Sequence, residues 1–146
     1  MNTDVEIRPT HNHDEYLAAL RVRVAVFVEE QNGPADEEPD RWDDTARHFV
    51  VVTGGAVVGT GRLYHPEFRL AKIGRVALLM PFRGRGWATS LMATMISQAR
   101  ALAMREVILD AQAYAEQFYQ RFGFQAEGEL FLDAGIPHRR MRLPLR

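Results

Sequence analysis

The stretch Arg83-Gly84-Arg85-Gly86 combines two permanent positive charges with two residues that lack a side chain. A short apolar run precedes it, and an apolar helical pattern follows it. The first turn of a helix has backbone N–H groups without partners and a partial positive charge, and glycine lets a ligand approach the backbone closely. These features predict an anion site suited to a pyrophosphate. An ordinary exposed turn is the plainer interpretation.

Other phosphate loops and other catalytic groups fit the chain poorly. A Walker A motif is absent, and a dinucleotide fingerprint would need glycine where the chain has Thr89. The chain has no cysteine, and Ser90 and Ser97 lie in the helical pattern rather than in a Gly-x-Ser-x-Gly elbow. The five histidines lack zinc-binding spacing. We therefore expect neither an acyl-enzyme nor a bound metal.

The segment Arg83-x-x-Gly86-x-Ala88 resembles the acyl-CoA pyrophosphate loop, [QR]-x-x-G-x-[GA], of the GCN5-related N-acetyltransferases (the GNAT family). A second motif supports this resemblance. Gln112 ends an apolar run of strand length, and Tyr119 follows seven residues later, shortly before a Gly-Phe pair. The resemblance covers essentially the whole chain and points to a bacterial subgroup whose acceptor substrate is poorly defined.

The resemblance implies that acetyl-CoA is the co-substrate and that Tyr119 is the general acid that protonates the departing CoA thiolate. A phenol has a pKa near 10 and a thiol near 8.5, so the proton can move as the thiolate forms. A core aromatic residue is the alternative interpretation of Tyr119. Most relatives have Asn at the position of Gln112. The other residues implied to contact the cofactor are Val76, Ala77 and Leu78, through backbone N–H groups, and Arg83, Gly84, Arg85, Gly86, Trp87, Ala88 and Thr89.

The acceptor amine must lose a proton before it attacks. Glu30 is the candidate general base, acting through a water molecule, and Glu29 is the second choice. His138 joins these two glutamates as a candidate acceptor-binding residue. A loop glutamate is more often simply solvated, and a lone histidine more often has a structural role. Because no serine or cysteine nucleophile is available, we expect direct transfer in a ternary complex.

The composition excludes several classes of protein. The 146 residues are nearly half apolar, and the net charge is −1, which gives no global basic field to attract nucleic acid. No apolar run approaches the ~20 residues that span a bilayer, and the polar N-terminus is unlike a signal peptide. We therefore expect a cytoplasmic protein that binds neither nucleic acid nor membrane.

Charge is unevenly placed along the chain. Residues 29–44 include eight acidic residues and one arginine, whereas residues 62–85 include six basic residues and one glutamate. A solvated loop is one interpretation of the acidic stretch. By the resemblance, the same stretch borders the acceptor site, where its carboxylates would attract a cationic substrate.

Hydrophobic periodicity predicts the order of the elements. Strands are expected over residues 5–8, 48–53, 56–64, 72–78, 107–111, 124–132 and 140–145. Residues 15–27 favour a helix capped by Asp14, although alternating valines keep a strand open as an alternative. A long helix follows the glycine turn, with an apolar stripe that runs to Leu102 and Ala103, and a short helix covers residues 113–121. Residues 135–138 are expected to form a turn.

These elements predict one α/β domain over residues 1–146. Its expected core is a mixed, mostly antiparallel sheet of six to seven strands, flanked by about four helices in the GNAT manner. The expected activity is acetyl-CoA-dependent N-acetylation of a primary amine on a small molecule or peptide. A non-catalytic acyl-CoA-binding sensor is the alternative, since it needs the loop but not Tyr119. The acceptor, the acyl length and the choice between monomer and homodimer stay open.

Overall fold

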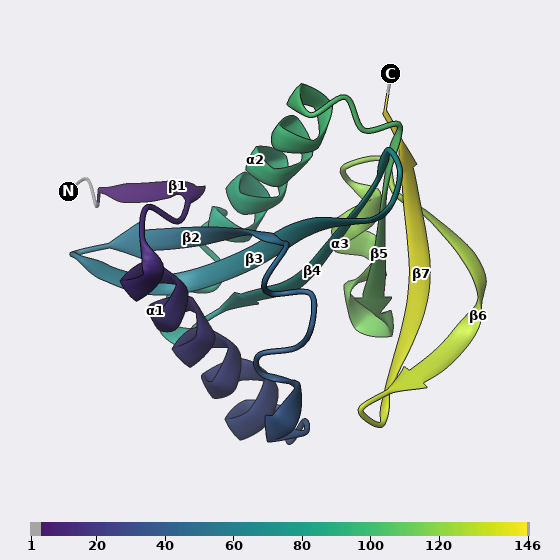
Figure 1. Cartoon of the computed structure of the whole chain (residues 1–146). Helices are drawn as coiled ribbons and strands as arrows, with labels where there is room; N and C mark the ends of the chain where they lie inside the picture. The colour runs from purple at the N-terminus through teal and green to yellow at the C-terminus, as the bar shows by residue number, and fades with distance from the viewer. Residues whose placement is uncertain (1–3, 146) are drawn as a thin grey trace.

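The computed structural model describes residues 4–145, which form a twisted seven-stranded sheet beside three α-helices (Figure 1). The strand order across the sheet is β1-β2-β3-β4-β5-β7-β6. The strands are β1 (Val5–Pro9), β2 (Arg47–Thr53), β3 (Ala56–Glu67), β4 (Leu70–Leu78), β5 (Glu106–Gln112), β6 (Gln125–Asp133) and β7 (Ile136–Pro144).

All neighbouring strands pair antiparallel except β4 and β5. The helix α2 (Trp87–Ala101) connects this parallel pair, as a parallel connection requires. The parallel ladder joins Leu70–Lys72 to Glu106–Ile108 and goes no further, so the two strands diverge toward their carboxyl ends. The expected mixed, mostly antiparallel sheet is confirmed.

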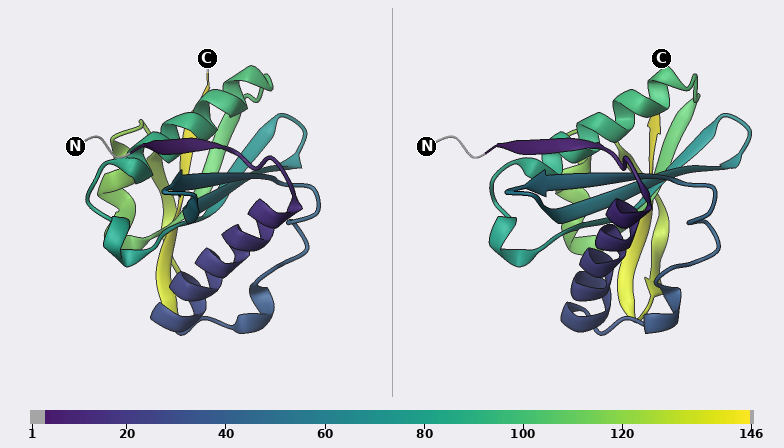
Figure 2. Two further views of the ribbon diagram at one scale, coloured as in Figure 1. Left: turned by 90° about the vertical axis from the view of Figure 1, so that its left-hand side faces the viewer. Right: turned by 60° about the vertical axis from the view of Figure 1, so that its left-hand side comes forward.

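Helices cover both faces of the sheet (Figure 2). The helix α1 (His13–Arg23) packs on one face, and a π-helical segment, Val24–Glu30, continues it. On the opposite face α2 buries the stripe Leu91, Met92, Met95, Ile96 and Ala99 in the main core. The short α3 (Glu116–Gln120) lies beside β5. Within residues 4–145, none of the helices has the length and apolar character needed to span a membrane.

Three local expectations differ from the structure. Asn12, rather than Asp14, caps α1, because its side chain accepts a hydrogen bond from the backbone N–H of Glu15 at 2.9 Å. The helix α2 ends at Ala101, so Leu102 and Ala103 lie beyond its buried stripe. Residues 136–138 belong to β7 and do not form a turn.

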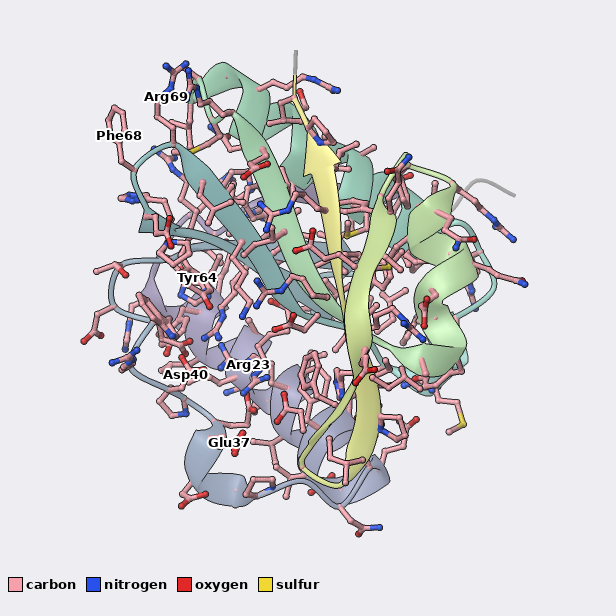
Figure 3. The ribbon with its side chains drawn as sticks, turned by 90° about the vertical axis from the view of Figure 1, so that its right-hand side faces the viewer. Arg23, Glu37, Asp40, Tyr64, Phe68 and Arg69 are labelled. Carbon is pink, nitrogen blue, oxygen red and sulfur yellow. The ribbon has the colours of Figure 1, made fainter. Side chains whose placement is uncertain are left out.

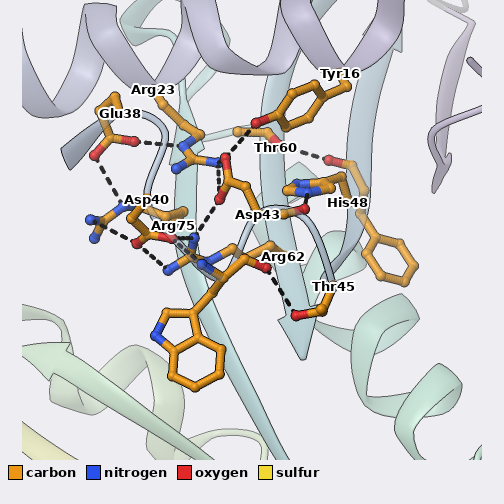
Figure 4. Close-up of polar contacts among 12 residues, drawn as sticks. Tyr16, Arg23, Glu38, Asp40, Asp43, Thr45, His48, Thr60, Arg62 and Arg75 are labelled. Atoms are coloured by element: carbon orange, nitrogen blue, oxygen red, sulfur yellow. Dashed lines mark hydrogen bonds and ion pairs between the residues drawn. The ribbon is translucent and has the colours of Figure 1, made fainter. Parts of the chain in front are cut away.

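The acidic loop between α1 and β2 is tied to the sheet by buried ion pairs (Figure 4). The guanidinium of Arg23, 1% exposed, donates to Glu38 at 2.6 Å and to Asp43 at 2.9 Å. Arg62 of β3 donates to Asp40 at 2.8 Å and also contacts Asp43. The solvated-loop interpretation is therefore wrong for these three carboxylates. Because arginines already neutralise them, they are also not free to attract a cationic acceptor.

We expect Asp43→Asn to lower the free energy of unfolding by about 3–5 kcal/mol, because it leaves the buried charges of Arg23 and Arg62 without their shared partner. Asp44→Asn changes an exposed neighbour and should shift the value by less than about 0.5 kcal/mol. Urea unfolding of both variants measures the difference. Equal midpoints would show that the ion pairs do not hold the loop.

Candidate functional site

A cavity of about 370 Å³ occupies the space where β4 and β5 diverge. The second half of β4, Ile73 to Leu78, forms one wall, and Leu109, Asp110 and Gln112 of β5 line the other. The π-helical segment and the region around α3 complete the lining with Glu30 and Tyr119, respectively. Segments far apart in the sequence therefore meet at one opening in the sheet.

The irregular pairing of β4 shapes this wall. Thr60 of β3 pairs with Ala77 and Arg62 pairs with Gly74, so β4 bulges between these pairs. Arg75 lies in the bulge with φ of 50°, a conformation that is uncommon for a residue with a side chain. Val76, Ala77 and Leu78 follow along the cavity, as the resemblance requires. Their predicted contacts with the cofactor stay a prediction.

The Arg/Gly loop gives α2 an open N-terminus. Gly84 and Gly86 have φ values of 79° and 83°, which favour glycine over other residues. A Cβ atom added at either position would meet nothing within 4 Å, so backbone conformation and not crowding selects glycine here. Gly86 occupies the N-cap position and provides no side-chain cap. The first backbone N–H groups of α2 are therefore without a side-chain partner from the cap residue.

The two loop arginines occupy different surroundings. Arg83 lines the cavity, and its Nε donates to the carbonyl of Leu78 at 2.9 Å. The guanidinium of Arg85 lies over the stacked rings of Phe82 and Trp87, at 5.3 and 5.2 Å from their centroids. The loop residues Gly84 to Thr89 follow Arg83 along the chain but do not line the cavity.

Glu30, the predicted general base, is paired with Arg83, the predicted pyrophosphate ligand. Both terminal nitrogens of Arg83 donate to the Glu30 carboxylate at 2.8 Å. These hydrogen bonds hold the pKa of Glu30 below its ordinary value, which makes the carboxylate a weaker base. Glu29 is exposed and lies outside the cavity lining.

Tyr119 and Gln112 lie together in the cavity lining, as predicted. The Tyr119 ring packs edge-on against Phe118 and Phe124, at centroid distances of 5.1 and 6.2 Å. Burial raises the pKa of Tyr119 to about 12, so the phenol is fully protonated at neutral pH. Gln112 donates to the side-chain oxygen of Gln31 at 3.0 Å, linking β5 to the end of the π-helical segment.

The cavity lining also contains groups that sequence reasoning missed, among them Tyr64, Lys72 and Asp110. Lys72 of β4 pairs with Asp110 of β5 at 3.0 Å, and the Tyr64 ring stacks on Trp42 at 4.7 Å. Figure 3 shows Tyr64 on the same side of the molecule as Arg23, Glu37 and Asp40. Spacing along the chain gives no signal for these contacts, because each joins separate elements. His138, which was predicted, lines the cavity from β7.

Comparisons with known proteins agree with this architecture. Residues 11–145 match the model of the "Acetyltransferase (GNAT) domain" family. The chain belongs to the GNAT family. The uncharacterized N-acetyltransferase YjcF of Bacillus subtilis is 37% identical over 131 residues, covering 89% of this chain and 93% of YjcF.

Solved structures share the fold across nearly the whole chain. An acyl-CoA N-acyltransferase from Pseudomonas aeruginosa has 32% identity and a TM-score of 0.85, covering 97% of this chain and 99% of that one. A Bacillus subtilis acetyltransferase in complex with CoA has a TM-score of 0.67 and covers 99% of this chain and 100% of that one. Its identity of 16% shows the GNAT fold alone.

The Glu30–Arg83 pair of this GNAT chain is largely open to solvent, with side chains 32% and 38% exposed. We therefore expect a double-mutant cycle of Glu30→Ala and Arg83→Ala to give a coupling energy in unfolding of about 0.2–1 kcal/mol, screened by salt. Urea unfolding at low and high salt measures it. A coupling above about 2 kcal/mol at both salt concentrations would mean that the pair is a structural clamp and hard for a ligand to replace.

Proposed function

We propose that this GNAT chain is an acetyl-CoA-dependent N-acetyltransferase that moves the acetyl group directly to a primary amine of a small molecule or peptide. One observation carries the proposal: a single cavity between diverging strands has the Arg83 loop at one end and the phenol of Tyr119 in its lining. This arrangement suits a long cofactor with a phosphate at one end and a thioester at the other.

The phosphates would bind at the start of α2. Backbone N–H groups there, without a cap side chain, provide donors for a pyrophosphate, and Arg83 and Arg85 would add charge. The pyrophosphate would replace the Glu30 carboxylate on Arg83. The pantetheine arm would then extend between β4 and β5, where backbone N–H groups of Val76 to Leu78 would hold it and stabilise the developing oxyanion.

Tyr119 would stabilise the leaving thiolate. Its raised pKa of about 12 keeps the proton on the phenol throughout the neutral range. A full transfer to a free thiolate would be uphill, since a thiol has a pKa near 8.5. The phenol would therefore act first as a hydrogen-bond donor to the sulfur while the carbon–sulfur bond breaks, and the collapse of the tetrahedral intermediate would drive the proton across.

The double substitution Arg83→Glu with Arg85→Glu should weaken CoA binding at least about 100-fold, because each charge-assisted hydrogen bond to phosphate contributes roughly 1.5–3 kcal/mol. Isothermal calorimetry with CoA measures the change. Arg100→Glu with Arg105→Glu is the matched control, since it reverses two exposed charges beyond the site and should leave the affinity within about threefold. If the loop variant binds CoA normally, the phosphate site is misassigned.

Tyr119→Phe should lower kcat by about 100-fold or more, within the range for a lost general acid, and leave CoA affinity unchanged. Release of free thiol from acetyl-CoA, with a panel of amines, measures kcat. Tyr114→Phe removes the exposed phenol beside the same cavity and should change kcat by less than about threefold.

Full activity in Tyr119→Phe would rule out the assigned acid. Tight CoA binding by the unchanged chain, with no transfer to any amine, peptide or protein lysine, would favour the alternative of a non-catalytic acyl-CoA sensor.

A further inference from the structure

The proposed transfer needs a group that accepts the amine proton, and Glu30 and His138 are two of the titratable groups that line the cavity. Glu30 accepts two hydrogen bonds from Arg83 at 2.8 Å. Those bonds reduce the basicity of the carboxylate while it is paired with Arg83. His138 is the other candidate, and its role depends on whether a ring nitrogen has a lone pair that can accept a proton.

The backbone fixes which nitrogen of His138 carries the proton. Nδ1 of the ring lies 2.7 Å from the carbonyl oxygen of Ile136. Because a carbonyl oxygen can only accept, Nδ1 must donate, and the neutral ring then has its lone pair on Nε2. Among residues 4–145, Nε2 has no hydrogen-bond partner, and it is not one of the polar atoms that are buried without a partner. Nε2 therefore keeps some exposed surface, and His138 lines the cavity.

Neighbouring strands also fix the plane of the ring. His138 pairs with Gln112 of β5 on one side and with Phe131 of β6 on the other. The Phe131 ring stacks on the imidazole at 6.0 Å with an interplanar angle of 27°. Residues directly opposite on neighbouring strands have side chains on the same face of the sheet, so His138 shares a face with Gln112. His138 as a whole residue is 9% exposed, and Nε2 is the ring nitrogen that the contact with Ile136 leaves unused.

We propose that His138, through Nε2, is the general base that takes the proton from the acceptor amine. This inference rests on the proposed acetyltransferase function. It assigns the proton-accepting role to a residue on β7, with Glu30 as the partner of Arg83 until the pyrophosphate of the cofactor replaces it.

The proposed step balances as follows. The nitrogen lone pair of the amine forms a bond to the thioester carbon, and the carbonyl electrons move to its oxygen. The N–H proton passes to His138 Nε2. When the oxyanion collapses, the carbon–sulfur bond breaks, and the sulfur takes the proton of Tyr119. Solvent then removes the proton from the imidazolium and restores the proton of the phenol, so the products are the amide and free CoA.

His138 lines the cavity described above and also a smaller neighbouring one. Several charged and titratable groups line these two cavities with it. Asp133 comes from β6, Arg75 from β4, and Glu37 and Glu38 from the loop before β2. Tyr119 shares the larger cavity. Of the two loop carboxylates, Glu38 is paired with both Arg23 and Arg75, and Glu37 lies 3.7 Å from Arg75.

The test is the pH profile of His138→Asn, in which the amide nitrogen can still donate to Ile136. In the unchanged protein kcat should fall toward acid, at the same pH for acceptors of different basicity, because the titrating group belongs to the protein. The variant should lose this acid limb and at least about 100-fold in kcat, while its KM for acetyl-CoA and its CoA affinity stay within about twofold.

Two matched variants separate the candidates. His65→Asn changes an exposed histidine of β3 and should keep kcat and its acid limb. Glu30→Gln should keep the acid limb, whatever its effect on kcat. An acid limb that persists in His138→Asn, or that disappears in Glu30→Gln, would overturn the assignment.

A measurement without turnover tests the ring directly. Nitrogen-15 chemical shifts of the histidines should show the neutral His138 ring protonated at Nδ1 and not at Nε2. The opposite tautomer would overturn the proposal even in an active enzyme. Absence of acetyl transfer by the unchanged chain would overturn this proposal together with the proposed function, whereas transfer with an unaltered acid limb in His138→Asn overturns this one alone.

Discussion

Strands β4 and β5 share a parallel ladder for three residue pairs and then part, and the candidate site occupies the space that opens between them. A continuous ladder would leave no room there, since paired strands lie only about 4.8 Å apart. The bulge at Arg75 accompanies the separation. The Arg75 guanidinium lies 3.0 Å from Glu38 and 3.6 Å from Asp40, and the Phe27 ring lies beneath it. The acidic loop therefore holds the strand at the point where it leaves its neighbour.

The same loop contributes the carboxylates of a buried ion network with Arg23 of α1 and Arg62 of β3, and these charges specify the position of the loop more than they add stability. Arg23 and Arg62 each retain one buried nitrogen without a hydrogen-bond partner. Desolvation of such groups is costly, so an ion network of this kind is weak evidence of net stabilisation. Removing one carboxylate nevertheless lowers the free energy of unfolding, because the charged arginines remain buried without it. The network therefore penalises any other position of the loop relative to β3 and β4.

Patterns local in sequence predicted much of this molecule. The apolar runs and the helical stripe of α2 indicated the strands and the long helix, and the Arg83–Ala88 motif indicated the family. Local patterns could not reveal contacts between distant elements. The acidic residues appeared solvated because their partners, Arg23 and Arg62, lie in α1 and β3.

Pro137 explains why residues 136–138 appeared to be a turn, since proline cannot donate to a ladder. The last residue of β5, Gln112, lies opposite His138. Pro137 therefore extends beyond β5 and pairs with β6 through Leu132. A proline is tolerated here because no β5 residue pairs with it. The following histidine consequently sits on a strand, where two neighbours fix it, and not on a flexible turn.

The π-helical segment fixes the position of Glu30, as β7 fixes that of His138. Alternating valines left helix and strand open in the sequence, and neither pattern predicts a wider turn. The seven π-helical residues end at Glu30, beside the Arg/Gly loop, where its carboxylate meets Arg83. A carboxylate that accepts hydrogen bonds from an arginine is a weaker base than an unpaired one. The two side chains meet different surroundings: Glu30 is paired with Arg83 beside the Arg/Gly loop, whereas His138 lines the cavity from β7 and its Nε2 has no hydrogen-bond partner among residues 4–145. The carboxylate oxygens of Glu30 keep further lone pairs, so the two groups differ in basicity: the guanidinium of Arg83 weakens the carboxylate as a base, whereas the hydrogen bond to Ile136 leaves the lone pair of His138 on Nε2.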